Sequence, residues 1–233
     1  MKIALLGYGR MGKEIEQIAI SRGHEIVIKK DVNDAIDITL ADVAIDFSVP
    51  NSAFNNISNC INNKVPVISG TTGWLDAYKD AVALCTEKKG AFIYASNFSV
   101  GVNIFFELNK QLAKMMGTLE SYNISMEEIH HTKKLDAPSG TAITLAEGII
   151  ENTSKKGWEL DVVSSEEKIP IVAKRITDVP GTHAVWYNSE VDTIEIKHTA
   201  HSRKGFALGA VIAAEWILDK TGVFSMKDVL NIH

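Results

Sequence analysis

The residues best suited to chemistry gather in one short segment of the chain. It runs from Glu127 to Ala142 and reads Glu-Glu-Ile-His-His-Thr-Lys-Lys-Leu-Asp-Ala-Pro-Ser-Gly-Thr-Ala. Two imidazoles and two ammonium groups stand ahead of Pro138 and Ser139, which are typical of the start of a helix. The backbone amides of Gly140 and Thr141 and the threonine hydroxyl would then face an anion at the helix N-terminus. The segment therefore indicates a receptor for a small carboxylate.

Two other interpretations of this segment stay open. A run rich in lysine is often only a solvated surface loop. A metal site is the second alternative, and its ligands would come from His130, His131, Glu127, Glu128, His198 and His201. Adjacent residues of a strand point to opposite faces, so the paired imidazoles rarely share one metal ion. We therefore predict a site without metal.

A glycine-rich turn near the N-terminus is the second candidate site. It comprises Gly7, Tyr8, Gly9, Arg10, Met11 and Gly12, which follow the first predicted strand and open the first predicted helix. In this setting the glycines permit a tight turn, a close approach of the backbone to a pyrophosphate and close helix packing. A turn without a ligand is the alternative, but the strand before it and the helix after it favour a bound dinucleotide.

Asp31 lies just beyond the second predicted strand, at the distance from the glycines where an acidic side chain accepts a hydrogen bond from the adenosine ribose. This position favours NADH. Lys29 and Lys30 stand beside it, and either could contact the 2′-phosphate of NADPH or remain a solvated surface charge. We therefore expect NADH or NADPH as the cofactor, with a preference for NADH.

Two further turns follow predicted strands and carry small or polar residues. They are Gly70, Thr71, Thr72 and Gly73 after one strand, and Ala95, Ser96, Asn97 and Phe98 after another. Each alone could be an ordinary capped turn. Because ligands of open α/β sheets bind beyond the carboxyl ends of the strands, three such turns on one edge indicate contacts to a nicotinamide ribose and its carboxamide.

The elements that must position these turns alternate between strand and helix patterns. Predicted strands cover 3–6, 26–28, 43–47, 65–69 and 91–95, and predicted helices cover 9–22, 54–60 and 75–88. This alternation is typical of βαβ units around a parallel sheet. Since crossovers between parallel strands are right-handed, the main topology left is a doubly wound sheet. The predicted fold class is α/β, with a Rossmann-type N-terminal domain.

The pattern changes after Gly117. Strand patterns then occur at 122–129, 171–176, 184–187 and 193–199, with a helix pattern at 141–151, and a longer helix pattern at 102–116 precedes them. These elements predict a second, α+β domain with a mixed sheet. We place the dinucleotide-binding domain at 1–100 and the substrate-binding and oligomerisation domain at 101–205, with a C-terminal helix at 206–233 packing back on the first domain.

The composition limits the classes of partner. The chain has 233 residues and a formal net charge of -5, which argues against nucleic acid or an anionic membrane as the main partner. No apolar run approaches the roughly 20 residues that span a bilayer, and no signal-peptide pattern is visible. Cys60 and Cys85 lie in helix patterns and are expected to be buried and reduced. We expect a cytoplasmic protein that attracts any anionic ligand through local positive groups.

The chain resembles the dihydrodipicolinate reductase family. The segment at 127–142 matches the family signature Glu-x-x-His-His-x-x-Lys-x-Asp-Ala-Pro-Ser-Gly-Thr-Ala. The similarity also covers the opening Gly-Arg-Met-Gly, the turn at 70–73, and the segments 97–103, 198–206 and 227–230. The resemblance therefore extends over the whole chain.

This resemblance implies a function and a set of residues. The implied reaction is the NAD(P)H-dependent reduction of 4-hydroxy-tetrahydrodipicolinate in lysine and diaminopimelate biosynthesis, carried out by a homotetramer whose two domains close over the ligands. On matching positions, His130 and Lys134 are implied as the acid–base pair, and either could deliver the proton. His131, Gly140 and Thr141 are implied as substrate ligands. The three turns, joined by Arg203 and Phe206, are implied as nucleotide contacts.

The chain departs from the family in two ways. Many relatives have Gly-x-x-Gly-x-x-Gly, whereas this chain has the commoner Rossmann spacing Gly-x-Gly-x-x-Gly, so a cofactor preference is not transferable from them. The chain is also short, and we expect the loss at about 32–41. Two other functions stay open, namely another Rossmann-type NAD(P)-dependent oxidoreductase acting on a small dicarboxylate, and a non-enzymatic nucleotide-sensing regulator.

Overall fold

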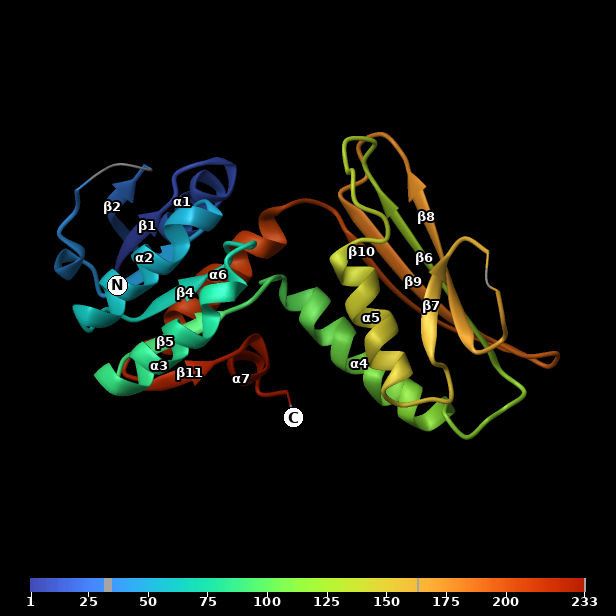
Figure 1. Ribbon diagram of the computed structural model, residues 1–233. Coiled ribbons are helices and arrows are strands. Elements are labelled where there is room, and N and C mark those ends of the chain that lie inside the picture. The colour runs from blue at the N-terminus through green and yellow to red at the C-terminus, as the bar shows by residue number, and fades with distance from the viewer. Residues whose placement is uncertain (32–34, 163, 233) are drawn as a thin grey trace. The chain divides into compact units, whose positions relative to one another are not determined.

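The computed structural model describes residues 1–31, 35–162 and 164–232 and divides the chain into two units (Figure 1). One unit comprises Met1–Asn103 and Lys204–His233, and the other comprises Ile104–Arg203. The first boundary falls inside helix α4 (Val100–Met116), and the second lies just before helix α6 (Lys204–Ile217). Part of the connection that we expected to be shortened, residues 32–34, lies outside the described residues.

The first unit is built on a six-stranded sheet in which every pairing is parallel. The strands run in the order β11-β5-β4-β3-β1-β2. Their bounds are β1 (Lys2–Leu6), β2 (Glu25–Lys30), β3 (Val43–Asp46), β4 (Val67–Ser69), β5 (Ala91–Tyr94) and β11 (Gly222–Phe224). The chain order reverses between β1 and β3, which makes the carboxyl ends of these strands the switch point where ligands bind. The predicted Rossmann-type sheet is confirmed.

Helices cover both faces of this sheet (Figure 1). On one face Ile3 and Leu5 pack under α1 (Arg10–Ser21) and α6, and on the other face Ala4 and Leu6 pack under α2 (Pro50–Asn62) and α3 (Tyr78–Lys88). Short 3-10 turns, η1 (Ile38–Leu40) and η2 (Leu75–Ala77), complete the connections. Because both faces are buried, the strands read as continuous apolar runs in the sequence.

The C-terminal helix expected from Phe206 is present, but it does not extend to the end of the range 206–233. Helix α6 ends at Ile217, and the chain then turns through Asp219 and Gly222, whose φ angles are +59° and +135°. Strand β11 follows and pairs with β5, and the short helix α7 (Met226–Leu230) comes next. A right-handed helix does not continue through residues of positive φ, so the helix pattern ends where this turn begins.

The second unit carries a five-stranded mixed sheet in the order β10-β9-β6-β8-β7. Its strands are β6 (Asn123–His130), β7 (Gly157–Leu160), β8 (Lys168–Arg175), β9 (Gly181–Asn188) and β10 (Thr193–Ala200). Strands β8 and β7 extend the sheet in parallel, whereas β9 runs antiparallel to both β6 and β10. Helices α4 and α5 (Gly140–Ile150) pack on one face over a core that includes Ile124, Met126 and Leu145. The predicted mixed sheet is confirmed.

The two cysteines lie in the interior, as expected. Cys60 and Cys85 are buried and unpaired, in α2 and α3. No described helix combines the length and the apolar character needed to cross a membrane.

Candidate functional site

The glycine-rich turn lies at the switch point of the first sheet. Gly7 has a φ of +101°, and a Cβ atom there would lie 2.2 Å from the Phe47 carbonyl oxygen. A Cβ on Gly12 would lie 2.4 Å from the Gly7 carbonyl oxygen. By contrast, a Cβ on Gly9 would meet nothing within 4 Å. The fold therefore requires Gly7 and Gly12, whereas Gly9 leaves open space of the kind that a pyrophosphate uses.

A pocket of about 190 Å³ opens beside this turn. Residues that follow β1, β2 and β3 line it, together with the first turns of α2: Gly7, Tyr8, Gly9, Lys30, Asp31, Phe47, Ser48, Val49, Ser52 and Asn56. Its place beyond the carboxyl ends of the strands suits the adenosine half of a dinucleotide. The structure thus brings four of the predicted cofactor residues, including Asp31, into one pocket.

The two lysines beside Asp31 both have partners. Lys29 Nζ lies 2.6 Å from Glu16 Oε1 and 5.1 Å from the centroid of the Tyr8 ring. Lys30 Nζ donates to Asn56 Oδ1 at 2.7 Å. A 2′-phosphate would have to compete with these contacts.

Asp46, at the carboxyl end of β3, ties together the loops around the pocket. It is fully buried, and it accepts hydrogen bonds from the hydroxyls of Ser48, Ser69 and Thr71 at 2.7–2.8 Å and from the amide of Asn56 at 2.9 Å. Burial raises the pKa of Asp46, and these hydrogen bonds oppose the rise. Thr71, predicted as a cofactor ligand, therefore has its hydroxyl engaged inside the protein. The sequence patterns did not indicate Asp46, although an acidic residue ending an apolar strand is a usable signal.

The other predicted cofactor residues are placed in different ways. Phe98 is buried and packs on Phe47, with ring centroids 5.8 Å apart, and Asn97 Oδ1 accepts from the Ser99 N–H at 2.8 Å. These contacts turn the Phe98 ring and Asn97 Oδ1 inward, whereas Ser96 is exposed. Gly70 and Thr72 follow β4, Ala95 and Ser96 follow β5, Arg10 and Met11 open α1, Arg203 precedes α6, and Phe206 lies in its first turn.

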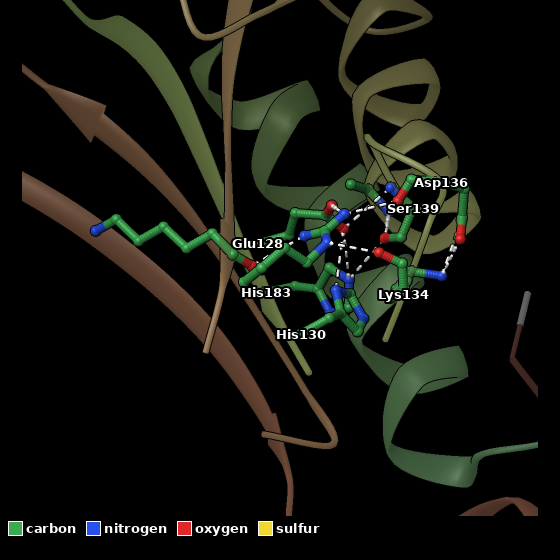
Figure 2. Close-up of polar contacts among 9 residues, drawn as sticks. Glu128, His130, Lys134, Asp136, Ser139 and His183 are labelled. Atoms are coloured by element: carbon green, nitrogen blue, oxygen red, sulfur yellow. Dashed lines mark hydrogen bonds and ion pairs between the residues drawn. The ribbon is translucent and has the colours of Figure 1, made fainter. Parts of the chain in front are cut away.

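In the second unit, strand β6 places Glu128 and His130 on the buried face of the mixed sheet (Figure 2). Side chains alternate along a strand, so these two residues continue the row begun by Ile124 and Met126. Glu128 lies opposite His183 of the neighbouring strand β9, and the two side chains lie on the same face of the sheet. The apolar face thus becomes polar at the carboxyl end of β6.

Glu128 is the centre of this polar cluster. Its Oε1 accepts from the Arg175 guanidinium at 3.1 Å, and its Oε2 accepts from the Ser139 N–H at 3.0 Å. The same Oε2 lies 3.3 Å from His130 Nδ1 and 3.8 Å from His183 Nε2. Burial by itself would raise the pKa of Glu128, but the nearby His130 imidazole and the hydrogen bond from Ser139 outweigh it and lower the pKa to about 2. The carboxylate is therefore ionised near neutral pH.

His183 is a neutral member of the cluster. Burial, and after it the positive charge of His130, lowers the pKa of His183 to about 3. Its Nε2 lies 3.1 Å from Ser139 Oγ, and its ring meets that of His130 edge to face at 5.0 Å between centroids. Near neutral pH this imidazole is uncharged.

The depressed pKa of His183 predicts a pH dependence of stability. Between its usual pKa, about 6.5, and its folded pKa, the unfolded chain binds the proton more tightly, so stability falls as the pH falls. The expected loss is about 2 kcal/mol between pH 6.5 and pH 5. Glu128 has the same sign but contributes only below about pH 4.5. Urea denaturation at both pH values should show a smaller loss for His183→Gln than for the parent, while the exposed His201→Gln should behave as the parent does.

Arg175 connects the cluster to the loop that carries Lys134. Its guanidinium donates to the carbonyl oxygens of Lys134 and Asp136 at 3.3 and 2.6 Å. Lys134 Nζ in turn donates to both carboxylate oxygens of Asp136, at 2.9 and 2.8 Å. The lysine is therefore held beside the end of β6.

The N-terminus of α5 lies next to the same cluster. Ser139 caps the helix, since its Oγ accepts from the Ala142 N–H at 3.2 Å. Gly140 and Thr141 form the first turn, with Gly140 exposed and Thr141 partly exposed. His131 follows β6 and is also partly exposed, and its buried Nδ1 meets no partner among the described residues. The structure thus brings all five predicted catalytic and substrate residues to adjoining positions in the second unit.

Three members of the cluster also have the spacing of metal ligands. Glu128, His130 and His183 each offer one atom, and these atoms lie within 4.8 Å of one another. The Arg175 guanidinium on the same carboxylate would repel a cation, and the Ser139 N–H already occupies Oε2. We interpret the group as a hydrogen-bonded cluster, and a site without metal stays a prediction.

Arg175 and His183 were not among the predicted site residues. Each stands in a row of alternating apolar residues in its strand, and this position is an available signal for a polar group on a buried face. The signal does not say which strands are neighbours, so it could not connect either residue to Glu128.

Comparison with known proteins gives one family across both units. The model of the dihydrodipicolinate reductase N-terminus matches residues 1–98, and that of the C-terminus matches residues 101–230. The 4-hydroxy-tetrahydrodipicolinate reductase of Christiangramia forsetii is 60% identical over 99% of this chain and 98% of its own length. That of Neisseria gonorrhoeae is 35% identical over 94% of this chain and 84% of its own length.

A solved structure shows the same fold. It is a dipicolinate-bound dihydrodipicolinate reductase from Paenisporosarcina sp. TG-14, with a TM-score of 0.78 and 22% identity, and the match covers 100% of this chain and 99% of that one. At this identity the likeness supports the architecture of both units.

Proposed function

Because the chain belongs to the dihydrodipicolinate reductase family, we propose that its first unit binds the nicotinamide cofactor of a reductase and its second unit binds the substrate. The activity is the NAD(P)H-dependent reduction of 4-hydroxy-tetrahydrodipicolinate to tetrahydrodipicolinate, in lysine and diaminopimelate biosynthesis. The observation that carries the residue assignment is the meeting of an acid–base cluster with a helix N-terminus at the end of β6. The helix N-terminus would bind a substrate carboxylate, and the acid–base cluster would supply the proton that the reduction consumes.

The binding half of the proposal concerns the substrate carboxylate. The backbone amides of Gly140 and Thr141 begin α5, where the helix dipole favours an anion. His131 and the ammonium group of Lys134 lie on the loop that leads into this helix and add donors for the same charge. The site therefore suits a small, doubly charged acid.

The chemical half concerns the proton. The net change replaces a hydroxyl group by hydrogen, so each turnover consumes one hydride and one proton and releases one water. A nicotinamide cofactor bound by the first unit supplies the hydride. His130 and Lys134 are the proposed donors of the proton, and such acid catalysis is typically worth about 10² to 10⁴ in rate.

The proposed cofactor is NADH or NADPH, with a preference for NADH. Support comes from Asp31 in the pocket lining and from the partners that already engage Lys29 and Lys30. Asp31→Ser should therefore raise the ratio of kcat/KM for NADPH to that for NADH by about 10-fold, because a carboxylate repels a 2′-phosphate. Steady-state kinetics with each nucleotide measures the ratio, and a ratio equal to that of the parent would count against this role of Asp31.

Thr141→Val should weaken substrate binding by removing the hydroxyl from the first turn of α5. We expect the substrate KM to rise by about 10-fold, since a hydrogen bond to a charged group is worth about 1.5–3 kcal/mol. Thr144→Val, at an exposed position of the same helix, is the matched control. Equal KM values in the two variants would remove Thr141 from the site.

A coupled assay tests the activity itself. Dihydrodipicolinate synthase generates the substrate in the cuvette, and the fall in absorbance of NADH or NADPH is followed. Oxidation of nucleotide that requires the synthase supports the proposed reaction. A nucleotide-sensing regulator would bind NADH without oxidising it, and a different reductase would ignore the synthase product.

We also propose that the protein is a cytoplasmic homotetramer, as the family resemblance implies. The face of the second sheet opposite α4 and α5 presents Val172, Thr193, Glu195 and Lys197 at its surface, and it is the face that we expect subunits to share. Light scattering that gives the mass of one chain would contradict the tetramer.

A further inference from the structure

We propose that Glu128 is a positioning residue that holds the His130 imidazole with Nδ1 turned inward and Nε2 left to face the substrate. The inference rests on the proposed function, because it explains how His130 would deliver its proton. Glu128 thereby has a role other than that of a metal ligand.

Strand geometry places the two groups together. Glu128 and His130 are two residues apart on β6 and lie on the same face, so the carboxylate reaches the near edge of the imidazole. Oε2 of Glu128 lies 3.3 Å from His130 Nδ1 (Figure 2). His130 Nδ1 is buried and has no hydrogen-bond partner with standard geometry among the described residues. The Glu128 carboxylate is therefore the group available to accept from it.

The neighbouring strand determines where the ring lies. A Cβ atom on Gly181 of β9 would stand 3.1 Å from His130 Nε2 and 3.3 Å from Cδ2, so the ring occupies the space that this glycine leaves. A larger residue there would push the ring away from its place beside Glu128. Glycine and carboxylate together restrict the imidazole to one orientation.

Both oxygens of the carboxylate are themselves held. Oε1 accepts a hydrogen bond from the Arg175 guanidinium, and Oε2 accepts one from the Ser139 N–H. The Ser139 N–H belongs to the N-cap of α5, where we place the substrate carboxylate. The same contacts therefore couple the orientation of His130 to the anion-binding turn.

The neighbouring His183 does not take over this role. It is uncharged near neutral pH, and its Nε2 lies closer to Ser139 Oγ, at 3.1 Å, than to the Glu128 carboxylate, at 3.8 Å. The Glu128 carboxylate therefore pairs with His130, the imidazole that is proposed to donate the proton.

The consequence for chemistry is a defined tautomer. A carboxylate beside Nδ1 keeps a proton on that nitrogen, so the proton given to the substrate is the one on Nε2. In that step the Nε2–H bond breaks and a bond from hydrogen to the substrate forms. The ring returns to neutrality with its proton on Nδ1, and solvent restores the proton on Nε2.

Nitrogen NMR of the unaltered protein tests the tautomer directly. With ¹⁵N-labelled histidine and at a pH where the ring is neutral, His130 should show a protonated Nδ1 and an unprotonated Nε2. His130→Gln identifies its signals. A neutral ring with the proton on Nε2 would overturn the inference without any variant of Glu128.

Kinetics of Glu128→Gln provide the second test. We expect kcat to fall by about 10²-fold, with the substrate KM within about 3-fold of the parent, because the acid is misoriented while the anion site remains. Glu127→Gln is the matched control, since its side chain lies on the opposite face of β6 and pairs with Lys174 at 2.5 Å. The control should keep parental kcat.

The outcomes separate this inference from the function on which it rests. If His130→Gln keeps parental kcat, the proposed donor is wrong. If His130→Gln loses activity but Glu128→Gln keeps both the kcat and the tautomer of the parent, His130 acts without the help of Glu128 and only the inference fails.

Discussion

Alanine in place of Lys134 or His130 should lower kcat by about 10²- to 10⁴-fold while nucleotide affinity stays close to that of the parent. Both residues lie at or just after the end of β6 in the second unit, whereas the pocket proposed for the dinucleotide belongs to the first unit. Each variant removes a group able to donate a proton and leaves the glycine-rich turn unchanged. Steady-state kinetics in the coupled assay and titration of NADH fluorescence measure the two quantities separately.

The neighbouring lysine provides the control for this experiment. Lys133 is exposed, and Lys133→Ala should keep parental kcat. Lys134 differs because its ammonium group is held by Asp136 beside the cluster. Parental turnover in both Lys134→Ala and His130→Ala would refute the assignment of the acid–base pair.

Gly9→Ala should weaken NADH binding by about 30-fold, or about 2 kcal/mol, without lowering the melting temperature. The reason lies in the space around the turn, because a Cβ at this position meets no protein atom within 4 Å. The added methyl group would stand where we expect the pyrophosphate to approach the backbone. Calorimetric titration with NADH and thermal unfolding of the free protein measure the two effects.

Gly7→Ala is the comparison variant, and we expect the opposite result. Its φ of +101° and the 2.2 Å approach of a Cβ to the Phe47 carbonyl oxygen predict a loss of stability. The backbone conformation alone would contribute about 1–3 kcal/mol. A Gly9→Ala protein that binds NADH as tightly as the parent would show that the turn is not the pyrophosphate site.

The fold could be predicted from the sequence because its strongest signals are local. In the first unit, short apolar runs alternate with amphipathic helices, and this pattern specifies a parallel sheet covered on both faces. The turn residues at 7–12 follow β1 in the structure as the glycine pattern requires. The mixed sheet of the second unit was also predictable, since apolar and polar residues alternate along the first halves of β6 and β10.

The elements that were missed are short or lack periodicity. Strand β11 has only three residues. It forms because the chain turns at Asp219 and Gly222, so that the next residues pair with β5. Strand β7 has four residues and begins with a glycine. In both cases pairing with a neighbouring strand stabilises a segment whose own preference is weak, and such pairing is invisible in a local pattern.

The candidate site was only half predictable for a related reason. The residues that are contiguous in the chain, from His130 to Thr141, could be recognised together. The partners that hold them, Arg175 on β8 and His183 on β9, come from strands whose order in the sheet has no local signal. Asp46 was missed in the same way, because its partners come from three separate segments. Long-range pairing therefore decides which polar residues support a site.

The central claim is that the end of β6 and the start of α5 receive the dicarboxylate that the enzyme reduces. The most direct test is a crystal structure of the protein with NADH and dipicolinate, a planar analogue of the substrate. We predict that one dipicolinate carboxylate accepts hydrogen bonds from the Gly140 and Thr141 amides, with His130 Nε2 and Lys134 Nζ beside the pyridine ring. Dipicolinate bound elsewhere on the protein, with that helix N-terminus empty, would contradict the claim.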